Sequence, residues 1–134
     1  MLMALKDKKQ IQKNHSFKQS FTHACFGIYR IFKEERNMRI HTSIAVLVIF
    51  VGWLLQITSS EWYWVMACIG WVFVAEVLNT IAENIVDLVT GKTYSELGKH
   101  IKDMAAGAVL ISACFAGIIG LWIFLPKIWL LLIH

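Results

Sequence analysis

Three long apolar stretches constrain what this chain of 134 residues can fold into. Residues 42–58 and 104–125 contain no charged residue, and residues 62–75 are apolar as far as Glu76, after which the apolar pattern continues. A helix needs about 20 residues to cross a hydrocarbon layer about 30 Å thick. We therefore predict an all-α integral membrane protein with three transmembrane helices. Their predicted bounds are about residues 40–58, 62–89 and 103–125.

The composition disfavours a water-soluble bundle of buried helices. Apolar residues make up 57% of the chain and charged residues 16%, and the mean hydropathy is +0.59. A soluble domain of this size would need more polar residues to cover its surface. The three cysteines are scattered and show no metal-ligand or redox spacing, so they are interpreted as small apolar side chains.

The positive charges predict the orientation of the chain. Nine of the 13 Lys and Arg residues lie within residues 1–41, three more lie between the second and third apolar stretches, and one lies near the C-terminus. Since Lys and Arg mark the cytoplasmic side, we expect a multi-pass plasma-membrane protein. Its N-terminus and the loop at residues 90–103 are expected to be cytoplasmic.

The residues outside the spans divide into three further segments. Residues 1–16 are basic and are expected to be mobile, and residues 127–134 form an apolar tail. Residues 17–38 carry apolar side chains at helical spacing between charged ones, which predicts an amphipathic helix in the membrane surface. The charges at residues 33–41 are most simply interpreted, from the residues alone, as a solvated cluster that anchors the first span.

A row of polar residues follows one side of the second predicted span. Glu76, Asn79, Glu83 and Asp87 are spaced three, four and four residues apart. On a helix they lie near about 0, −60, −20 and +20°, which is one narrow stripe. Each charge near a membrane centre costs about 2.5–3.5 kcal/mol. A chain that carries several such charges on one face is expected to use them.

Depth predicts different roles for the two glutamates. A span that enters lipid near Trp62 leaves it near Ile81, so Glu83 lies at the border with water and Glu76 lies about 7–8 Å inside that border. Glu83 can reach a hydrated metal or a nucleotide phosphate. Glu76 reaches a group dissolved in the membrane, which suits a general base. This spacing suits transfer of a phosphoryl group from a soluble donor to a lipid hydroxyl.

The third span and the loop before it add two expectations. Small residues recur every fourth position in two rows, and such rows let helices approach closely in lipid. This face is expected to pack within or between chains. Because three helices make a thin core and the acidic stripe needs a wall opposite it, we expect the chain to self-associate. Lys102 lies near the start of this helix, where a cation opposes the helix dipole, and is expected to face an anion. The tripeptide Gly91-Lys92-Thr93 lacks the glycine and the strand of a phosphate-binding P-loop.

Together these residues resemble a known family. The segments A-E-V-L-N-T-I-A-E-N-I-V-D (75–87) and K-D-M-A-A-G-A-V-L (102–110) are similar to the signature of the prokaryotic diacylglycerol kinases, and E-E-R-N-M-R-I-H (34–41) is similar to the segment before their first span. The resemblance covers about residues 17–126. The ending F-L-P (124–126) and the K-D-M-A-A-G variant are more similar to the Gram-positive branch, which is associated with undecaprenol.

The resemblance implies a trimeric lipid kinase that uses ATP and Mg²⁺, with no nucleic-acid partner. It implies that Glu76 is the catalytic base and that Glu35 and Glu83 bind the metal, which replaces the simpler interpretation of residues 33–41. It further implies lipid-substrate contacts for Glu76, Asn79 and Arg39. The implied ATP contacts are Glu35, Glu83, Lys102, Asp103, Tyr94, Ser95 and Ser16.

Three alternatives remain open from the sequence. The same enzyme acting on diacylglycerol is the nearest one, because both lipids present a hydroxyl above apolar chains. A small proton or cation transporter would also carry buried acids, although the outer half of every span is apolar. A non-catalytic packing subunit is the third. We predict a kinase that converts undecaprenol to undecaprenyl phosphate.

Overall fold

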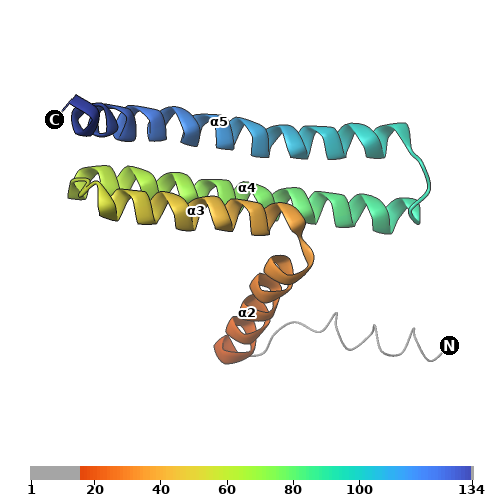
Figure 1. Cartoon of the computed structure of the whole chain (residues 1–134). Helices are drawn as coiled ribbons and strands as arrows, with labels where there is room; N and C mark the ends of the chain where they lie inside the picture. Colours follow the sequence, from red (N-terminus) through yellow and green to blue (C-terminus); the bar gives the residue numbers. More distant parts are fainter. Residues whose placement is uncertain (1–15, 134) are drawn as a thin grey trace. The chain divides into compact units, whose positions relative to one another are not determined.

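The computed structural model describes residues 16–133, and every regular element in that range is an α-helix (Figure 1). The basic segment predicted to be mobile therefore lies outside the described residues, apart from Ser16, as does the last residue of the predicted tail. The chain divides into two units, residues 1–34 and residues 35–134. Each is described by itself.

Helix α2, Phe17–Glu34, is the helix of the first unit. It begins where Ser16 Oγ accepts a hydrogen bond from the Gln19 N–H at 3.2 Å, which satisfies one of the free amides of a helix start. Arg30 and Glu34 pair one turn apart at 3.0 Å. The helix ends four residues before the predicted bound of 38 because Glu35 adopts an extended backbone and residues 36–38 belong to the next helix.

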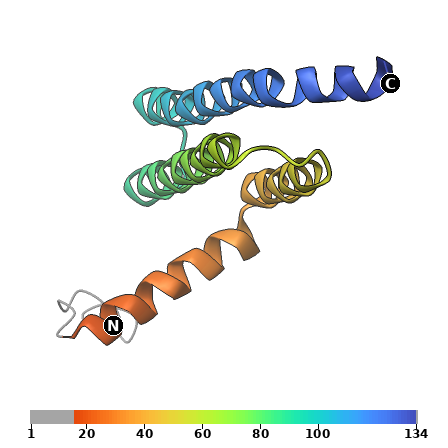
Figure 2. The same cartoon turned by 90° about the vertical axis from the view of Figure 1, so that its left-hand side faces the viewer.

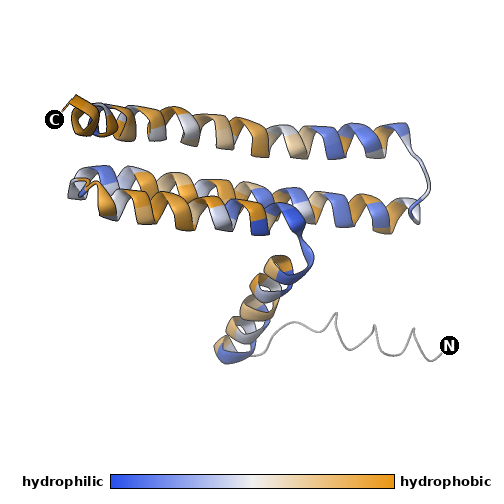
Figure 3. Cartoon of the chain, in the orientation of Figure 1, coloured by the Kyte–Doolittle hydropathy of each residue, from blue (hydrophilic) through white to orange (hydrophobic). Residues whose placement is uncertain are grey.

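The second unit contains α3, Arg36–Leu54, α4, Ser59–Thr90, and α5, Glu96–Ile133. All three are long and apolar enough to cross a membrane, which confirms the predicted class of an all-α chain with three spans. The helices lie side by side with α4 between α3 and α5 (Figures 1 and 2). Polar residues gather at the end of the unit where α3 begins, α4 ends and α5 begins (Figure 3).

Local capping sets the helix ends. The turn after α3 is tight, since the Ile57 N–H donates to the Gly52 carbonyl and a Cβ at Gly52 would lie 3.0 Å from the Trp62 ring. Thr58 and Glu61 form a reciprocal capping box at the start of α4. Gly91 ends that helix in the left-handed conformation, φ 59°, which glycine adopts without strain.

Helix α5 is longer than the charge-free stretch that predicted it. It begins seven residues before residue 103 and continues eight residues beyond residue 125, through Pro126. Uncharged stretches mark the part of a helix that suits lipid, whereas caps and contacts mark its ends. The segment predicted as an apolar tail is thus a continuation of α5 as far as Ile133, and Lys127 pairs with Glu61 of α4 at 3.1 Å.

Candidate active site at the polar end of the helices

Glu76 is the most buried charged residue of the described chain, with 1% of its surface exposed. It lies on the face of α4 that packs inside the unit, and the Asn37 side-chain amide of α3 donates a hydrogen bond to it. Its second oxygen, Oε2, is buried and has no hydrogen-bond partner within the described residues. Buried polar atoms are normally satisfied, so this oxygen is available to a ligand.

Three other ionisable groups lie close enough to Glu76 to interact with it electrostatically: His41 on α3, Glu83 on α4 and Glu35 at the start of α3. The sequence spacing predicted that Glu76 and Glu83 share a face. The structure adds Glu35, because the extended residue before α3 lies beside the polar stripe of α4. The region around Glu76 therefore contains three carboxylates from two segments of the chain.

Asn79 lies between Glu76 and Glu83 in the polar stripe of α4. Its amide nitrogen donates a hydrogen bond to Glu83 Oε1 at 3.2 Å, one helical turn away. Asn79 is 4% exposed, and its carbonyl oxygen is buried without a partner in the described part of the chain. The same holds for the hydroxyl of Thr80, which is 5% exposed. Unpaired acceptors and hydroxyls of this kind can orient a bound hydroxyl or a water.

The residues predicted to bind Mg²⁺ suit that ion. No cluster of three or more Asp, Glu, His or Cys side chains that could form a complete metal site occurs in residues 16–133. Magnesium is commonly bound by one or two carboxylates together with water and substrate phosphates. Glu35 and Glu83 both interact electrostatically with Glu76, and together they supply two carboxylates at the polar end of the helices.

A polar pocket of about 530 Å³ opens where α4 ends and α5 begins. On its wall, Lys102 of α5 donates a hydrogen bond to Asp87 Oδ1 of α4 at 2.5 Å. The prediction that Lys102 faces an anion is therefore confirmed, and that anion is a side chain of the neighbouring helix. A second pair on the same wall joins Lys99 to Asp103 at 2.6 Å.

The connector residues predicted to contact nucleotide also line this pocket. Tyr94 is 82% exposed. Ser95 has a structural role, because its hydroxyl accepts the Gly98 N–H at 3.2 Å and caps α5. Gly98 must be small, since a Cβ there would lie 2.9 Å from Val86 Cγ1. The pocket thus brings together Tyr94, Ser95, Lys102 and Asp103.

Two of the residues predicted to bind substrate belong neither to the group around Glu76 nor to the polar pocket. Ser16 belongs to the first unit, where it caps α2. Arg39 is an exposed residue of α3, and its backbone N–H donates to the carbonyl of Glu35 at 3.3 Å. Neither contact places these side chains against a substrate.

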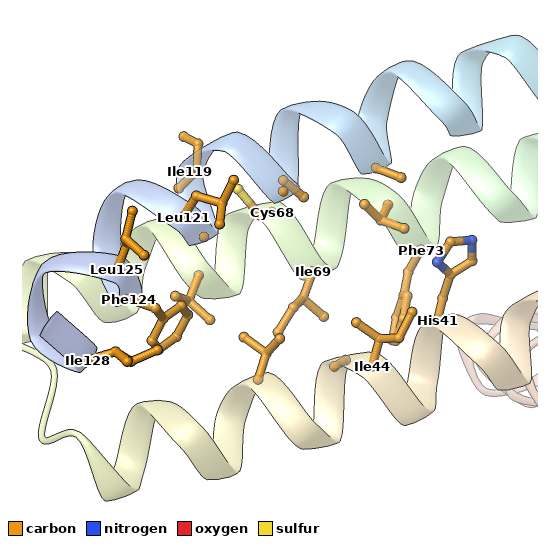
Figure 4. Close-up of a pocket in the computed structure, with 18 residues that line it drawn as sticks. His41, Ile44, Cys68, Ile69, Phe73, Ile119, Leu121, Phe124, Leu125 and Ile128 are labelled. Atoms are coloured by element: carbon orange, nitrogen blue, oxygen red, sulfur yellow. The ribbon is translucent and has the colours of Figure 1, made fainter. Parts of the chain in front are cut away.

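An apolar pocket of about 510 Å³ lies between α3, α4 and α5 (Figure 4). His41 marks one end of it, and Phe124 and Ile128 lie toward the other end. Small residues of α5, Ala113, Ala116, Gly117 and Gly120, form part of the wall. Because His41 also acts on Glu76, this pocket leads away from the carboxylates into the apolar part of the helices.

Sequence reasoning missed Asn37, His41 and Thr80. Asn37 and His41 are four residues apart, so they share a face of α3 at the point where charged residues give way to the apolar run. That spacing was a usable signal. Thr80 offered none, because a threonine in an apolar helix normally bonds to the backbone of its own helix.

Comparisons with known proteins identify the family of this chain. The chain belongs to the prokaryotic diacylglycerol kinase family, whose model matches residues 22–124. It is 44% identical to an undecaprenol kinase of Bacillus subtilis over 84% of this chain and 90% of that protein. It is 37% identical to a diacylglycerol kinase of Synechocystis over 94% and 75% of the two chains.

A third relative is the diacylglycerol kinase of Haemophilus influenzae, which is 29% identical over 69% of this chain and 78% of that protein. The predicted family is therefore confirmed, and the protein is a multi-pass membrane kinase that acts on a lipid.

Proposed function

We propose that this kinase transfers the γ-phosphate of MgATP to the hydroxyl of undecaprenol and releases undecaprenyl phosphate and ADP. The observation that carries the choice of lipid is the 44% identity to an undecaprenol kinase over 90% of that protein. The apolar pocket that begins near Glu76 and continues along the helices supports it, because a polyprenyl chain is long and entirely apolar.

Glu76 acts as the general base in this proposal. Its free oxygen, Oε2, accepts the proton of the lipid hydroxyl while the hydroxyl oxygen forms a bond to the γ-phosphorus and the bond to the β-phosphate oxygen breaks. The hydrogen bond from Asn37 fixes the orientation of the carboxylate. Burial among helices suits this role, since the base meets a hydroxyl that arrives from the membrane.

Glu35 and Glu83 would hold Mg²⁺, which supplies positive charge against the phosphates when bound. The hydrogen bond from Asn79 at 3.2 Å fixes the Glu83 carboxylate toward that position. We place the phosphates near Lys102 and the rest of the nucleotide in the polar pocket with Asp103, Tyr94 and Ser95. Arg39 is proposed as a contact to the lipid.

The proposed orientation in the membrane follows from the location of ATP. ATP is cytosolic, so the polar end of α3, α4 and α5 faces the cytoplasm, in agreement with the positive charges near the N-terminus and in the loop after α4. We further propose that the protein is a homotrimer. Part of the small-residue rows on α5 lines the pocket inside the chain, but Ala108 of one row is exposed and would let a helix of a second chain approach closely, which supports self-association.

Diacylglycerol is the second candidate substrate. The specific observation in its favour is that two relatives, from Synechocystis and Haemophilus influenzae, are diacylglycerol kinases. The identity over aligned residues is lower for both of them than for the undecaprenol kinase, at 37% and 29% against 44%.

A transfer assay tests the proposal. Purified protein in mixed micelles is given MgATP labelled at the γ-phosphate together with undecaprenol or diacylglycerol, and label in the lipid is measured. We expect faster transfer to undecaprenol, and a strong preference for diacylglycerol would overturn our choice of lipid. Glu76→Gln should lower transfer by about 10²–10⁴-fold without loss of assembly. Glu34→Gln, an exposed acid of α2, is the control and should be active.

A further inference from the structure

Two ion pairs join α4 to α5 within the described residues, one toward each end of the packed helices. Lys127 pairs with Glu61 at 3.1 Å, and Lys102 pairs with Asp87 at 2.5 Å. Both link a lysine of α5 to a carboxylate of α4, so they are chemically alike. They differ in their surroundings, because only the second lies on the wall of the polar pocket.

Helix stability explains the Glu61–Lys127 pair and leaves the other unexplained. Glu61 is an acid in the first turn of α4, where the helix dipole favours negative charge, and it also caps the helix. Asp87 is an acid three residues before the end of the same helix, where the dipole opposes it. Lys102 lies in the second turn of α5, beyond the first turn where the dipole acts, so the helix dipole does not account for a charge there either.

Lys102 retains hydrogen-bonding capacity beside Asp87. A lysine ammonium has three N–H donors, and the structure gives Asp87 one of them. The Lys102 side chain is 36% exposed and lines the pocket of about 530 Å³. A free lysine on its four-carbon stem would have to be ordered when it binds an anion, and that ordering weakens binding. Asp87 removes this requirement by fixing the ammonium in advance.

We infer that Asp87 is a positioning residue of the nucleotide site, which holds the Lys102 ammonium on the pocket wall so that its remaining donors meet a phosphate. The inference rests on the proposed kinase function and adds a role for a residue that the proposed mechanism does not use. The carboxylate acts through Lys102 and touches neither the transferred phosphoryl group nor the lipid hydroxyl.

The test compares Asp87→Asn with Glu61→Gln, each of which removes one of the two interhelical pairs. For Asp87→Asn we expect the KM for MgATP to rise about tenfold, the size of effect seen when an orienting partner is lost, while the KM for the lipid stays within twofold of wild type. Glu61→Gln should leave both KM values unchanged. Asp87→Glu, which restores a carboxylate, should recover part of the loss.

Equilibrium binding of a non-hydrolysable MgATP analogue separates this inference from the proposed function. Wild type should bind the analogue, and Asp87→Asn should bind it about tenfold more weakly. Failure of the wild type to bind would refute the kinase assignment itself. If wild type and Asp87→Asn bind equally well, and both pair-breaking variants merely melt at a lower temperature, Asp87 is only a structural link between helices.

Discussion

The Asn79 amide donates a hydrogen bond to Glu83 Oε1 at 3.2 Å, from one turn earlier on the same helix. This contact lies within the polar stripe of α4, where Asn79 stands between Glu76, the proposed base, and Glu83. An asparagine in a membrane-spanning helix is expensive unless it is paired. Here its nitrogen is paired with a proposed metal ligand, while its oxygen is left for another group.

Asn79→Ala should therefore raise the Mg²⁺ concentration that the reaction needs, with a smaller effect on the stability of the fold. Without its donor, the Glu83 carboxylate is free to rotate, and loss of such an orienting partner commonly costs 10–100-fold in metal affinity or activity. We expect the Mg²⁺ concentration for half-maximal transfer to rise by about tenfold or more. The measurement is a Mg²⁺ titration of lipid phosphorylation at fixed ATP. Asn84→Ala, an exposed asparagine of α4, is the control, and equal Mg²⁺ curves for the two variants would contradict this role.

Asn37→Ala tests the contact that only the packing of α3 on α4 creates. It removes the hydrogen bond to the Glu76 carboxylate, so the proposed base is less well oriented, and we expect kcat to fall by about tenfold with the KM for ATP unchanged. Ser43→Ala removes a hydroxyl that donates to the Arg39 carbonyl of its own helix, and it should behave as wild type. The prediction fails if kcat is retained, or if the two variants lose activity equally.

Ala116→Trp should narrow the apolar pocket. Ala116 lines the pocket between the three helices, so a large ring there competes with a long lipid chain. We expect the KM for undecaprenol to rise by about tenfold or more, because each methylene group that loses its contact in an apolar pocket costs about 1–3 kcal/mol. A short-chain isoprenoid alcohol has fewer such contacts to lose, so the rise in its KM should be smaller. Ile118→Trp places the same ring on an exposed part of α5. Equal loss with both alcohols would show that the pocket does not hold the chain.

Gly98→Ala should destabilise the junction of α4 and α5. The new Cβ would lie 2.9 Å from Val86 Cγ1 and 3.3 Å from Ser95 Cβ, and overpacking of this kind costs about 1–3 kcal/mol. The second substitution Val86→Ala removes the clashing methyl and should recover part of that loss. Unfolding by SDS in mixed micelles measures both. Gly27→Ala is the control, because its added Cβ meets no described atom within 4 Å beyond the neighbouring backbone of its own helix. An unchanged stability of Gly98→Ala would show that the junction can relax.

Much of the site could be predicted from α4 alone. The positions of Glu76, Asn79 and Glu83 on one face follow from helical periodicity, because residues three and four apart are neighbours on any helix. The prediction that Lys102 faces an anion followed from an expected helix start near residue 103, although α5 begins at Glu96. That the anion is Asp87 could not be predicted, because residues 15 positions apart meet only through the packing of two helices.

The sequence by itself determined the membrane class, the number of spans and the polar stripe, because hydropathy and helical period are properties of single segments. The tertiary structure decided which side chains meet across helices. It placed Asn37 and His41 of α3 beside Glu76, paired Lys102 with Asp87, and formed an apolar pocket that has His41 in its wall. Lipid-facing helices are all alike in being apolar, so their mutual register depends on close packing and a few polar contacts.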